Sequence, residues 1–244
     1  MSPRTAPPGV VRSYWATSRS HRYSLVFALP LLVTYEVLEA VAPIRSSGGV
    51  IRNGADVILA ELASWIFGAR GPLILMAIVI GASVVLIWRD RGAGPVRARV
   101  FAMMVGESLL LAAAFGFVVG IATMQVLHSL SVPAGAESSV ARLTLSIGAG
   151  LYEELLFRVI LVAAFANGLR FLGFGRMLGG GLAVFAGALI FSAFHYIGPL
   201  GEPFRMESFV FRAIAGLAFS ALYLTRGFGI TAWTHALYDI GVLL

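Results

Sequence analysis

Long apolar runs separated by short polar stretches follow one another along almost the whole chain. As a helix rising about 1.5 Å per residue, each run can cross most or all of a hydrocarbon layer about 30 Å thick. The fifth run and the last two are short, so we expect them to begin or end in the interface. The runs are Ser24–Ala42, Pro72–Trp88, Val100–Val126, Leu143–Phe165, Leu182–Ile197, Phe209–Leu224 and Phe228–Leu244. The pattern predicts an all-α, polytopic transmembrane helix bundle.

The stretch 52–68 is ambiguous, because it mixes charged residues with large apolar ones. The distribution of arginine helps to interpret it. If the N-terminus is cytoplasmic and 52–68 lies in the outer interface, the arginine-rich loop 89–99 and Arg226 fall inside. The loop 128–140 then falls outside, and it contains no arginine. This arrangement obeys the positive-inside rule, so we predict seven spans and one interfacial helix, with an eighth span at 52–68 as the alternative.

Composition agrees with a membrane protein. Hydrophobic residues make up 59% of the 244 residues and charged residues only 12%, about half the share in a soluble domain. The net charge of +6 comes from arginines that lie mainly between the apolar runs, so the expected partner is the lipid bilayer and not nucleic acid. The absence of cysteine excludes disulfides and thiolate chemistry. We expect 1–22 to be a cytoplasmic tail without a cleavable signal peptide, and 23–244 to be one integral membrane domain.

The fourth run contains a pair of adjacent glutamates. An ionisable side chain inside a span costs about 2.5 to 3.5 kcal/mol, so each one needs a partner or a function. Glu154 and Arg158 are spaced i, i+4 and are predicted to form a structural ion pair on one helix face. Neighbouring positions on an α-helix point roughly 100° apart, so Glu153 lies on a different face and is available for chemistry.

Two histidines lie in later runs. His195 follows Phe191 by four residues, and a lone histidine among apolar residues is more often part of the core than a catalyst. His235 and Asp239 are spaced i, i+4, which is also consistent with a local pair that stabilises the last helix. Together with Glu153, however, these residues supply one carboxylate and one imidazole that can hold and deprotonate a water. The second imidazole can donate to an oxyanion.

These motifs resemble those of the CPBP family of intramembrane proteases, also called the ABI or CAAX-protease family. That family carries Glu-Glu-x-x-x-Arg, then Phe-x-x-x-His, then His-x-x-x-Asn or His-x-x-x-Asp on successive late helices. The order and spacing agree over about residues 145–244. The resemblance implies peptide-bond hydrolysis within the bilayer, by an active site in the last four spans. It implies that Glu153 and His195 activate the water, while His235 and Asp239 hold the oxyanion.

The role of Asp239 is open in one respect. An asparagine at this position can donate an amide N–H, whereas Asp239 can donate only if it is protonated. Alternatively, it accepts a hydrogen bond from His235 and keeps that ring oriented. By the same resemblance, Glu154, Arg158 and Phe191 are supporting, structural residues.

The expected mechanism needs no cofactor, and zinc is the alternative. Glu153, His195 and His235 could bind zinc and leave a fourth position for water. The chain has no His-Glu-x-x-His sequence, and no ligand is spaced i, i+4 from His195. It has no Gly-x-Ser-x-Gly sequence either, and nothing marks Ser192 as a nucleophile. We therefore favour a glutamate mechanism without metal.

The resemblance also implies a membrane-anchored or lipidated protein substrate, and we expect the enzyme in the cytoplasmic membrane of a bacterium. With the N-terminus inside, counting along the spans places the four site residues between the bilayer centre and the outer face. That position favours an exported substrate over a cytoplasmic one.

Two other functions are compatible with the pattern. A non-proteolytic scaffold or immunity protein could keep this fold, but loss of Glu153 or of a motif histidine would be its mark, and all three are present. A transporter would distribute charges along its spans, whereas here they concentrate in the last four. The sequence assigns no role to four further charged residues, for which a structural or interfacial role is the default. These are Glu36, Glu39, Glu107 and Arg212.

Overall fold

The computed structural model describes residues 13–46, 49–90, 95–127, 138–197 and 201–243, and nearly all of them are helical. The α-helices are α1 Tyr14–Ser18, α2 His21–Val41, α3 Gly54–Phe67, α4 Gly71–Arg89, α5 Ala98–Leu127, α6 Ser139–Gly148, α7 Ala163–Phe171, α8 Arg176–Phe194, α9 Met206–Arg226 and α10 Phe228–Leu243. A short 3₁₀ helix, η1 (Gly68–Arg70), and a π-helix, η3 (Ala149–Val162), complete them. The all-α class is confirmed. The tail 1–12 and most of the loop 128–140 lie outside the described residues.

One feature that the apolar pattern did not predict is a small antiparallel strand pair. Strand β1 (Ile44–Ser46) pairs with β2 (Gly49–Ile51), and Ile44 lies opposite Ile51. This pair returns the chain from the end of α2 to the start of α3. It therefore sets where residues 52 and 53 stand relative to α2.

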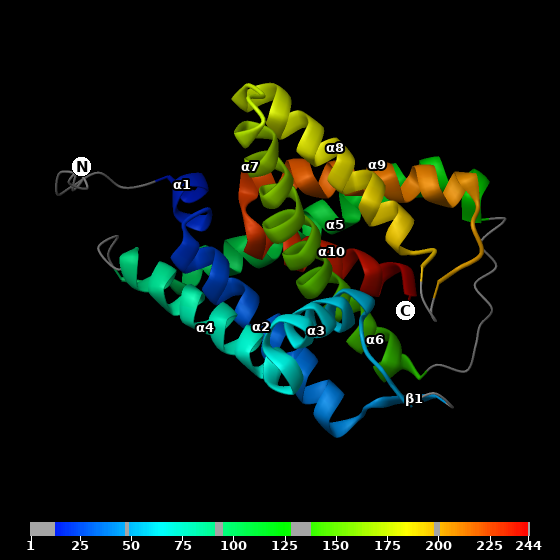
Figure 1. Ribbon diagram of the computed structural model, residues 1–244, viewed down its shortest axis with the longest axis horizontal. Coiled ribbons are helices and arrows are strands. Elements are labelled where there is room, and N and C mark those ends of the chain that lie inside the picture. Colours follow the sequence, from blue (N-terminus) through cyan, green and yellow to red (C-terminus); the bar gives the residue numbers. More distant parts are fainter. Residues whose placement is uncertain (1–12, 47–48, 91–94, 128–137, 198–200, 244) are drawn as a thin grey trace.

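The last helix occupies the middle of the bundle. Only Gly227 separates α9 from α10, and its φ of +80° lies in the left-handed region that glycine tolerates without steric cost. The resulting sharp turn sends α10 back through the molecule, where it packs against α2, α5, α6, η3 and α9 (Figure 1). The residues carried by α10 therefore face several other helices at once.

The predicted run 143–165 is not one regular α-helix. Helix α6 continues into η3, in which hydrogen bonds reach five residues along the chain, and then into α7. The backbone here approaches its neighbours very closely. A Cβ added at Gly148 would lie 2.9 Å from the Cβ of Asn53, and one added at Gly150 would lie 2.7 Å from the Cβ of Ala236. Wide π turns of this kind often accompany functional sites.

Five described stretches are long and apolar enough to cross a membrane. They are His21–Val41, Gly54–Arg89, Ala98–Val118, Arg176–Phe194 and Met206–Arg226. The runs 143–165 and 228–244 are not among them: the first contains three charged residues, Glu153, Glu154 and Arg158, and α10 has only 16 residues. The region 54–89 is a pair of helices packed on each other, α3 and α4. The number of spans, and the interfacial position of 52–68, stay predictions.

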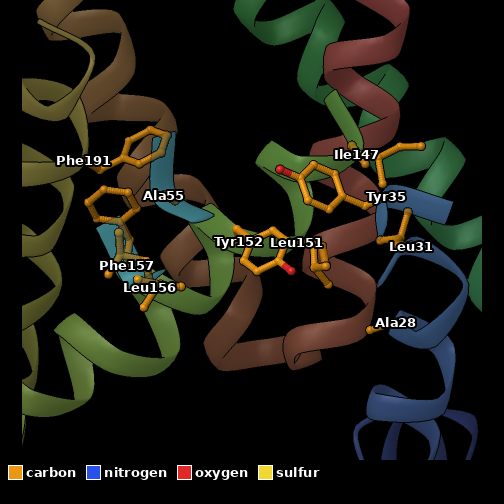
Figure 2. Close-up of a cluster of buried hydrophobic side chains, with 13 residues drawn as sticks. Ala28, Leu31, Tyr35, Ala55, Ile147, Leu151, Tyr152, Leu156, Phe157 and Phe191 are labelled. Atoms are coloured by element: carbon orange, nitrogen blue, oxygen red, sulfur yellow. The ribbon is translucent and has the colours of Figure 1, made fainter. Parts of the chain in front are cut away.

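The core lies where α2, α3, η3 and α10 meet. Figure 2 shows the rings of Tyr35 and Tyr152 on one side of η3, with Phe157 and Phe191 on its other side. The Tyr35 and Tyr152 ring centroids are 5.1 Å apart, and those of Phe157 and Phe191 are 5.2 Å apart. In the sequence, Glu153 and Glu154 lie between Tyr152 and Phe157, which each belong to one of these two aromatic pairs.

The predicted topology treats Arg226 as a free loop charge, but the structure buries this residue. Only 2% of it is exposed, and its guanidinium lies 3.9 Å above the Trp15 ring. Nε and Nη2 donate to the two oxygens of Glu107 at 2.5 and 2.6 Å, because α9 ends beside α5 and α1. A buried, neutralised arginine contributes little to the positive-inside bias, so the orientation prediction rests on the remaining arginines.

Candidate active site

Glu153 lies within η3 and is held by a residue from a distant part of the chain. The Nδ2 of Asn53 donates to its Oε1 at 3.2 Å. Both residues are buried, with 6% of each exposed. The other oxygen, Oε2, is buried and accepts no hydrogen bond from any residue in the described part of the chain. One oxygen of this carboxylate is therefore fixed and the other is available.

Glu154 is fully buried and lies between Arg158 and His235. Its Oε1 is 3.1 Å from Nη1 of Arg158, so the predicted i, i+4 ion pair is present. The same oxygen is 2.7 Å from Nδ1 of His235, a contact that the sequence did not predict. The Arg158 guanidinium also lies 4.4 Å from the centroid of the Phe191 ring. Glu154 thus links η3 to the central helix α10 as well as to Arg158.

His195 follows the last residue of α8. Its Nδ1 is 2.9 Å from the carbonyl oxygen of Phe191, which can only accept a hydrogen bond. This contact assigns the proton of the neutral ring to Nδ1 and leaves Nε2 as the basic nitrogen. The rings of Phe191 and Phe194 meet the imidazole edge to face, with centroids 5.0 and 5.9 Å away. The ring orientation is therefore fixed by a backbone acceptor and two aromatic neighbours.

His235 has a carboxylate at each ring nitrogen. Glu154 lies at Nδ1, and Oδ2 of Asp239 lies 3.6 Å from Nε2, one helix turn away. The ring stacks on Phe219 with centroids 4.4 Å apart and planes 20° apart. Of the two carboxylates, Asp239 is the more open, with 24% of its side chain exposed.

The structure brings the four predicted site residues together from three helices. Glu153 of η3 interacts electrostatically with His195, which follows α8, and with His235 and Asp239 of α10. The Phe191 ring meets both imidazoles edge to face, with centroids 5.0 Å from His195 and 6.3 Å from His235. These residues therefore surround one centre, although their catalytic roles stay a prediction.

A second polar network, which the sequence did not predict, lies next to this centre. Glu36 accepts a 2.5 Å hydrogen bond from the Tyr152 hydroxyl and pairs with Nη2 of Arg52 at 3.3 Å. Asp56 is 2.5 Å from Nε of Arg52 and accepts a hydrogen bond from the Tyr35 hydroxyl at 3.0 Å. Burial alone would lower the pKa of Arg52, but the Asp56 carboxylate outweighs it and the pKa is raised, so this guanidinium stays charged. The network gives the unassigned Glu36 a structural role.

The remaining unassigned residues fall into different classes. Arg212 pairs with Glu202 at 2.6 Å and donates to Ser208 at 2.9 Å. The Glu202 N–H donates to the His195 carbonyl at 2.9 Å, so the ion pair with Glu202 connects Arg212 of α9 to the backbone at His195. Both carboxylate oxygens of Glu39 are buried and have no hydrogen-bond partner among the described residues.

Ser192 has a structural contact. Its hydroxyl donates to the carbonyl oxygen of Phe209 at 2.6 Å, between α8 and α9. A serine nucleophile would need a base within hydrogen-bonding reach of this hydroxyl. The contact with Phe209 agrees with the view that Ser192 is not a nucleophile.

The zinc alternative does not fit the described side chains. No group of three or more His, Asp or Glu residues in the described part of the chain is placed to hold a metal ion. His235, one of the three expected ligands, has Glu154 at Nδ1 and Asp239 near Nε2. We therefore assign no step of the chemistry to a metal.

Comparison with known proteins adds the family. Residues 135–241 match the family model described as Rce1-like, type II CAAX prenyl endopeptidase Rce1-like. The C-terminal part of the chain is therefore similar to that family. No curated protein and no solved structure matches the chain significantly. The match indicates a CAAX-type intramembrane protease, and the apolar helices of the chain agree with an integral membrane protein.

The matched segment contains all three sequence motifs, but it does not contain Asn53 or the Glu36–Arg52 pair. In the sequence, Asn53 has only a local signal. Asn-Gly-Ala-Asp at 53–56 precedes an apolar helix, which is typical of a helix N-cap. A cap alone does not reveal which distant carboxylate the amide will reach.

Proposed function

We propose that the protein is an intramembrane endopeptidase in which Glu153 and His195 activate a water. The observation that supports this best is the state of the Glu153 carboxylate, whose Oε1 is held by Asn53 while its buried Oε2 has no partner in the described residues. His195 has its Nδ1 occupied by a carbonyl oxygen, so Nε2 can accept a hydrogen bond from the same water. A water held by two such acceptors can give up a proton as it attacks a peptide carbonyl.

The oxyanion would be held by His235, with Asp239 as its partner. With a carboxylate at each nitrogen, the ring is fully satisfied only when both nitrogens donate, and Nε2–H then faces the more open side of the site. A preorganised donor of this kind is the usual device for stabilising a tetrahedral intermediate. In this proposal Asp239 orients and electrostatically supports the imidazole.

The substrate would be a membrane-associated protein. The proposed catalytic residues lie on or directly after helices within an apolar bundle, and the family model is described as a type II CAAX prenyl endopeptidase. We therefore propose an anchored or lipidated protein as the substrate class. The proposed mechanism needs no metal, because the described side chains supply both the base and the oxyanion donor.

The proposed site would lie toward the end of α2 that is far from the N-terminus. His21, in the first turn of α2, contacts Asp90 at 3.5 Å, whereas Glu36 contacts Arg52 and Tyr152. These two levels of α2 are separated by about 22 Å along the helix axis. If the N-terminus is cytoplasmic, this favours a site that opens to the outer face and a substrate that is exported.

The function can be tested by proteomics of membranes from a deletion strain complemented with wild-type protein or with Glu153→Ala. We expect at least one membrane-anchored protein to stay uncleaved in the Glu153→Ala strain and to be processed in the wild-type strain. The purified protein should also cleave that substrate, or a farnesylated CAAX peptide, in detergent. Identical proteomes in the two strains, with no cleavage by the purified protein, would favour the non-proteolytic scaffold.

The orientation has a separate test, because the chain has no cysteine. Single cysteines can be placed at Ser139, the exposed first residue of α6, and at Val96, exposed just before α5, and labelled in intact cells with a membrane-impermeant maleimide. We expect labelling at Ser139→Cys and none at Val96→Cys. The opposite pattern would turn the site to the cytoplasm.

A further inference from the structure

Asn53 has all of its side-chain geometry fixed by the fold. Its Oδ1 accepts the Ala55 N–H at 2.9 Å and so caps α3, while its own backbone N–H donates to the Tyr35 hydroxyl at 3.2 Å. Because Oδ1 is committed to the cap, the NH₂ group must point the other way, and there it meets Oε1 of Glu153. The helix cap therefore ensures that the Glu153 carboxylate faces the NH₂ group of Asn53 and not its carbonyl oxygen.

The approach of Asn53 to Glu153 is also fixed by the residues that precede them. Arg52 precedes Asn53, Tyr152 precedes Glu153, and both bind the carboxylate of Glu36 on α2. The two chain segments are therefore tied to one common group, although 100 residues separate Asn53 from Glu153. Three elements, α2, α3 and η3, converge on this contact.

From this geometry we propose that Asn53 is the positioning residue of the catalytic base. Its amide N–H holds Oε1 of Glu153 and thereby directs Oε2 toward the water. This inference rests on the proposed function, since it assumes that Glu153 is the base. It also means that the site is completed from outside the family-matched segment 135–241, by a residue of the N-terminal half.

The first test needs no substrate. The chain has only two asparagines, Asn53 and Asn167, and Asn167 is exposed on α7. Protein labelled with ¹⁵N at asparagine therefore gives two side-chain NH₂ groups in a nuclear magnetic resonance spectrum. We expect an Asn53 NH₂ proton to move upfield in Glu153→Ala, because a charge-assisted hydrogen bond is lost, while Asn167 stays unchanged. An Asn53 signal that does not respond to Glu153→Ala would overturn the inference.

The second test separates capping from positioning. Serine and aspartate cap helices about as well as asparagine, so both variants should keep α3, and Asn53→Ser should also keep the thermal stability, which Asn53→Asp lowers by burying a second carboxylate beside Glu153. Neither can donate an amide N–H to Glu153, and we expect kcat to fall about 10- to 100-fold with KM little changed, because the base is misplaced. Asn53→Asp should also shift the acidic limb of the pH–rate profile to higher pH, since a second carboxylate then faces the base.

Asn167→Ser is the matched control, and it should leave kcat, KM and the pH profile unchanged. The substrate is the farnesylated CAAX peptide or, if that is not cleaved, the protein that accumulates in the Glu153→Ala strain. Wild-type kcat and pH profile in a stable Asn53→Ser would make Asn53 a helix cap only and would overturn the inference, while the proposed function stands. If Glu153→Gln is instead fully active, the proposed function itself is wrong.

Discussion

Two glutamate–arginine pairs, each with a buried arginine, differ in how many oxygens of the glutamate accept hydrogen bonds. In the pair of Glu107 and Arg226, both carboxylate oxygens accept hydrogen bonds from the guanidinium, and Tyr14 donates a third. In the pair of Glu154 and Arg158 only Oε1 is engaged, and it is shared with a histidine. The first pair involves no residue of the candidate site, whereas the glutamate of the second also contacts His235.

The tyrosine at the first pair strengthens this contrast. Burial, together with the neighbouring Glu107, raises the pKa of Tyr14 to about 12, so its hydroxyl stays a donor at every physiological pH. That pair, together with Tyr14, therefore holds α1, α5 and α9 together throughout the physiological pH range. Beside the second pair, Glu153 keeps an unpartnered oxygen in the described part of the chain. The Glu107 carboxylate has hydrogen bonds to both of its oxygens, whereas the proposed base Glu153 has one to Oε1 only.

The largest expected effect distinguishes Glu153, the proposed base, from Glu107, a structural glutamate. Glu153→Gln should lower kcat about 100- to 10,000-fold, because the general base is lost, with little change in melting temperature. Glu107→Gln should do the reverse and mainly lower the melting temperature. Steady-state kinetics and thermal unfolding in detergent measure both. Substantial turnover by Glu153→Gln would refute its assignment as the base.

The two arginines provide the next comparison. Arg158→Ala leaves the buried Glu154 carboxylate without its cation and should cost about 3 to 5 kcal/mol in unfolding free energy, whereas Arg226→Ala leaves a half-buried Glu107 that Tyr14 still contacts and should cost less. Only Arg158→Ala should also lower the specific activity of the folded fraction. Without Arg158, Glu154 is no longer fixed in the position from which it contacts His235. Unfolding monitored by circular dichroism, combined with active-fraction kinetics, tests this. Equal loss of specific activity in Arg226→Ala would show that the two pairs are not functionally distinct.

A smaller effect is expected at Asp239. Asparagine can still accept from His235 and can also donate, so Asp239→Asn should keep kcat within about 10-fold of the wild type. Asp239→Ala should lower kcat about 100-fold or more, because the oxyanion site loses a preorganised polar group. Similar kcat values for the two variants would mean that Asp239 acts only as a local partner in α10.

The smallest effect is expected from chelation. If Glu153 and His195 activate the water without metal, treatment with a chelator should leave the cleavage rate unchanged. Elemental analysis of the purified protein should then find no stoichiometric zinc. Activity that is lost on chelation and restored by zinc alone would show that the metal-free mechanism is wrong.

What the sequence could predict follows the range of each interaction. The helices, the Glu154–Arg158 pair and the closeness of His235 to Asp239 depend on periodicity or on i, i+4 spacing, which are local in the chain. The contacts of Glu153 with Asn53 and of Glu154 with His235 span 100 and 81 residues. No pattern within a single helix encodes them, so they appear only when the bundle is assembled.

Two expectations failed or changed for related reasons. The burial of Arg226 depends on α5 and α1, which lie far from it in sequence, so the arginine looked like an ordinary loop charge. The π turns of η3 arise where the backbone packs closely against α10 and Asn53, and hydrophobic periodicity cannot distinguish them from α turns. Helix existence was therefore predictable, whereas the local winding of the helix was not.

Gly148 limits how far the two halves of this chain can be exchanged. Even a methyl group there would meet the Tyr35 ring and the Cβ of Asn53, so the N-terminal half fits only a C-terminal half that leaves this space open. A chimera that joins the N-terminal half of this chain to a relative's C-terminal segment must therefore bring glycine at 148 or a smaller partner at 35. At this contact the two halves of the chain can therefore be redesigned only together.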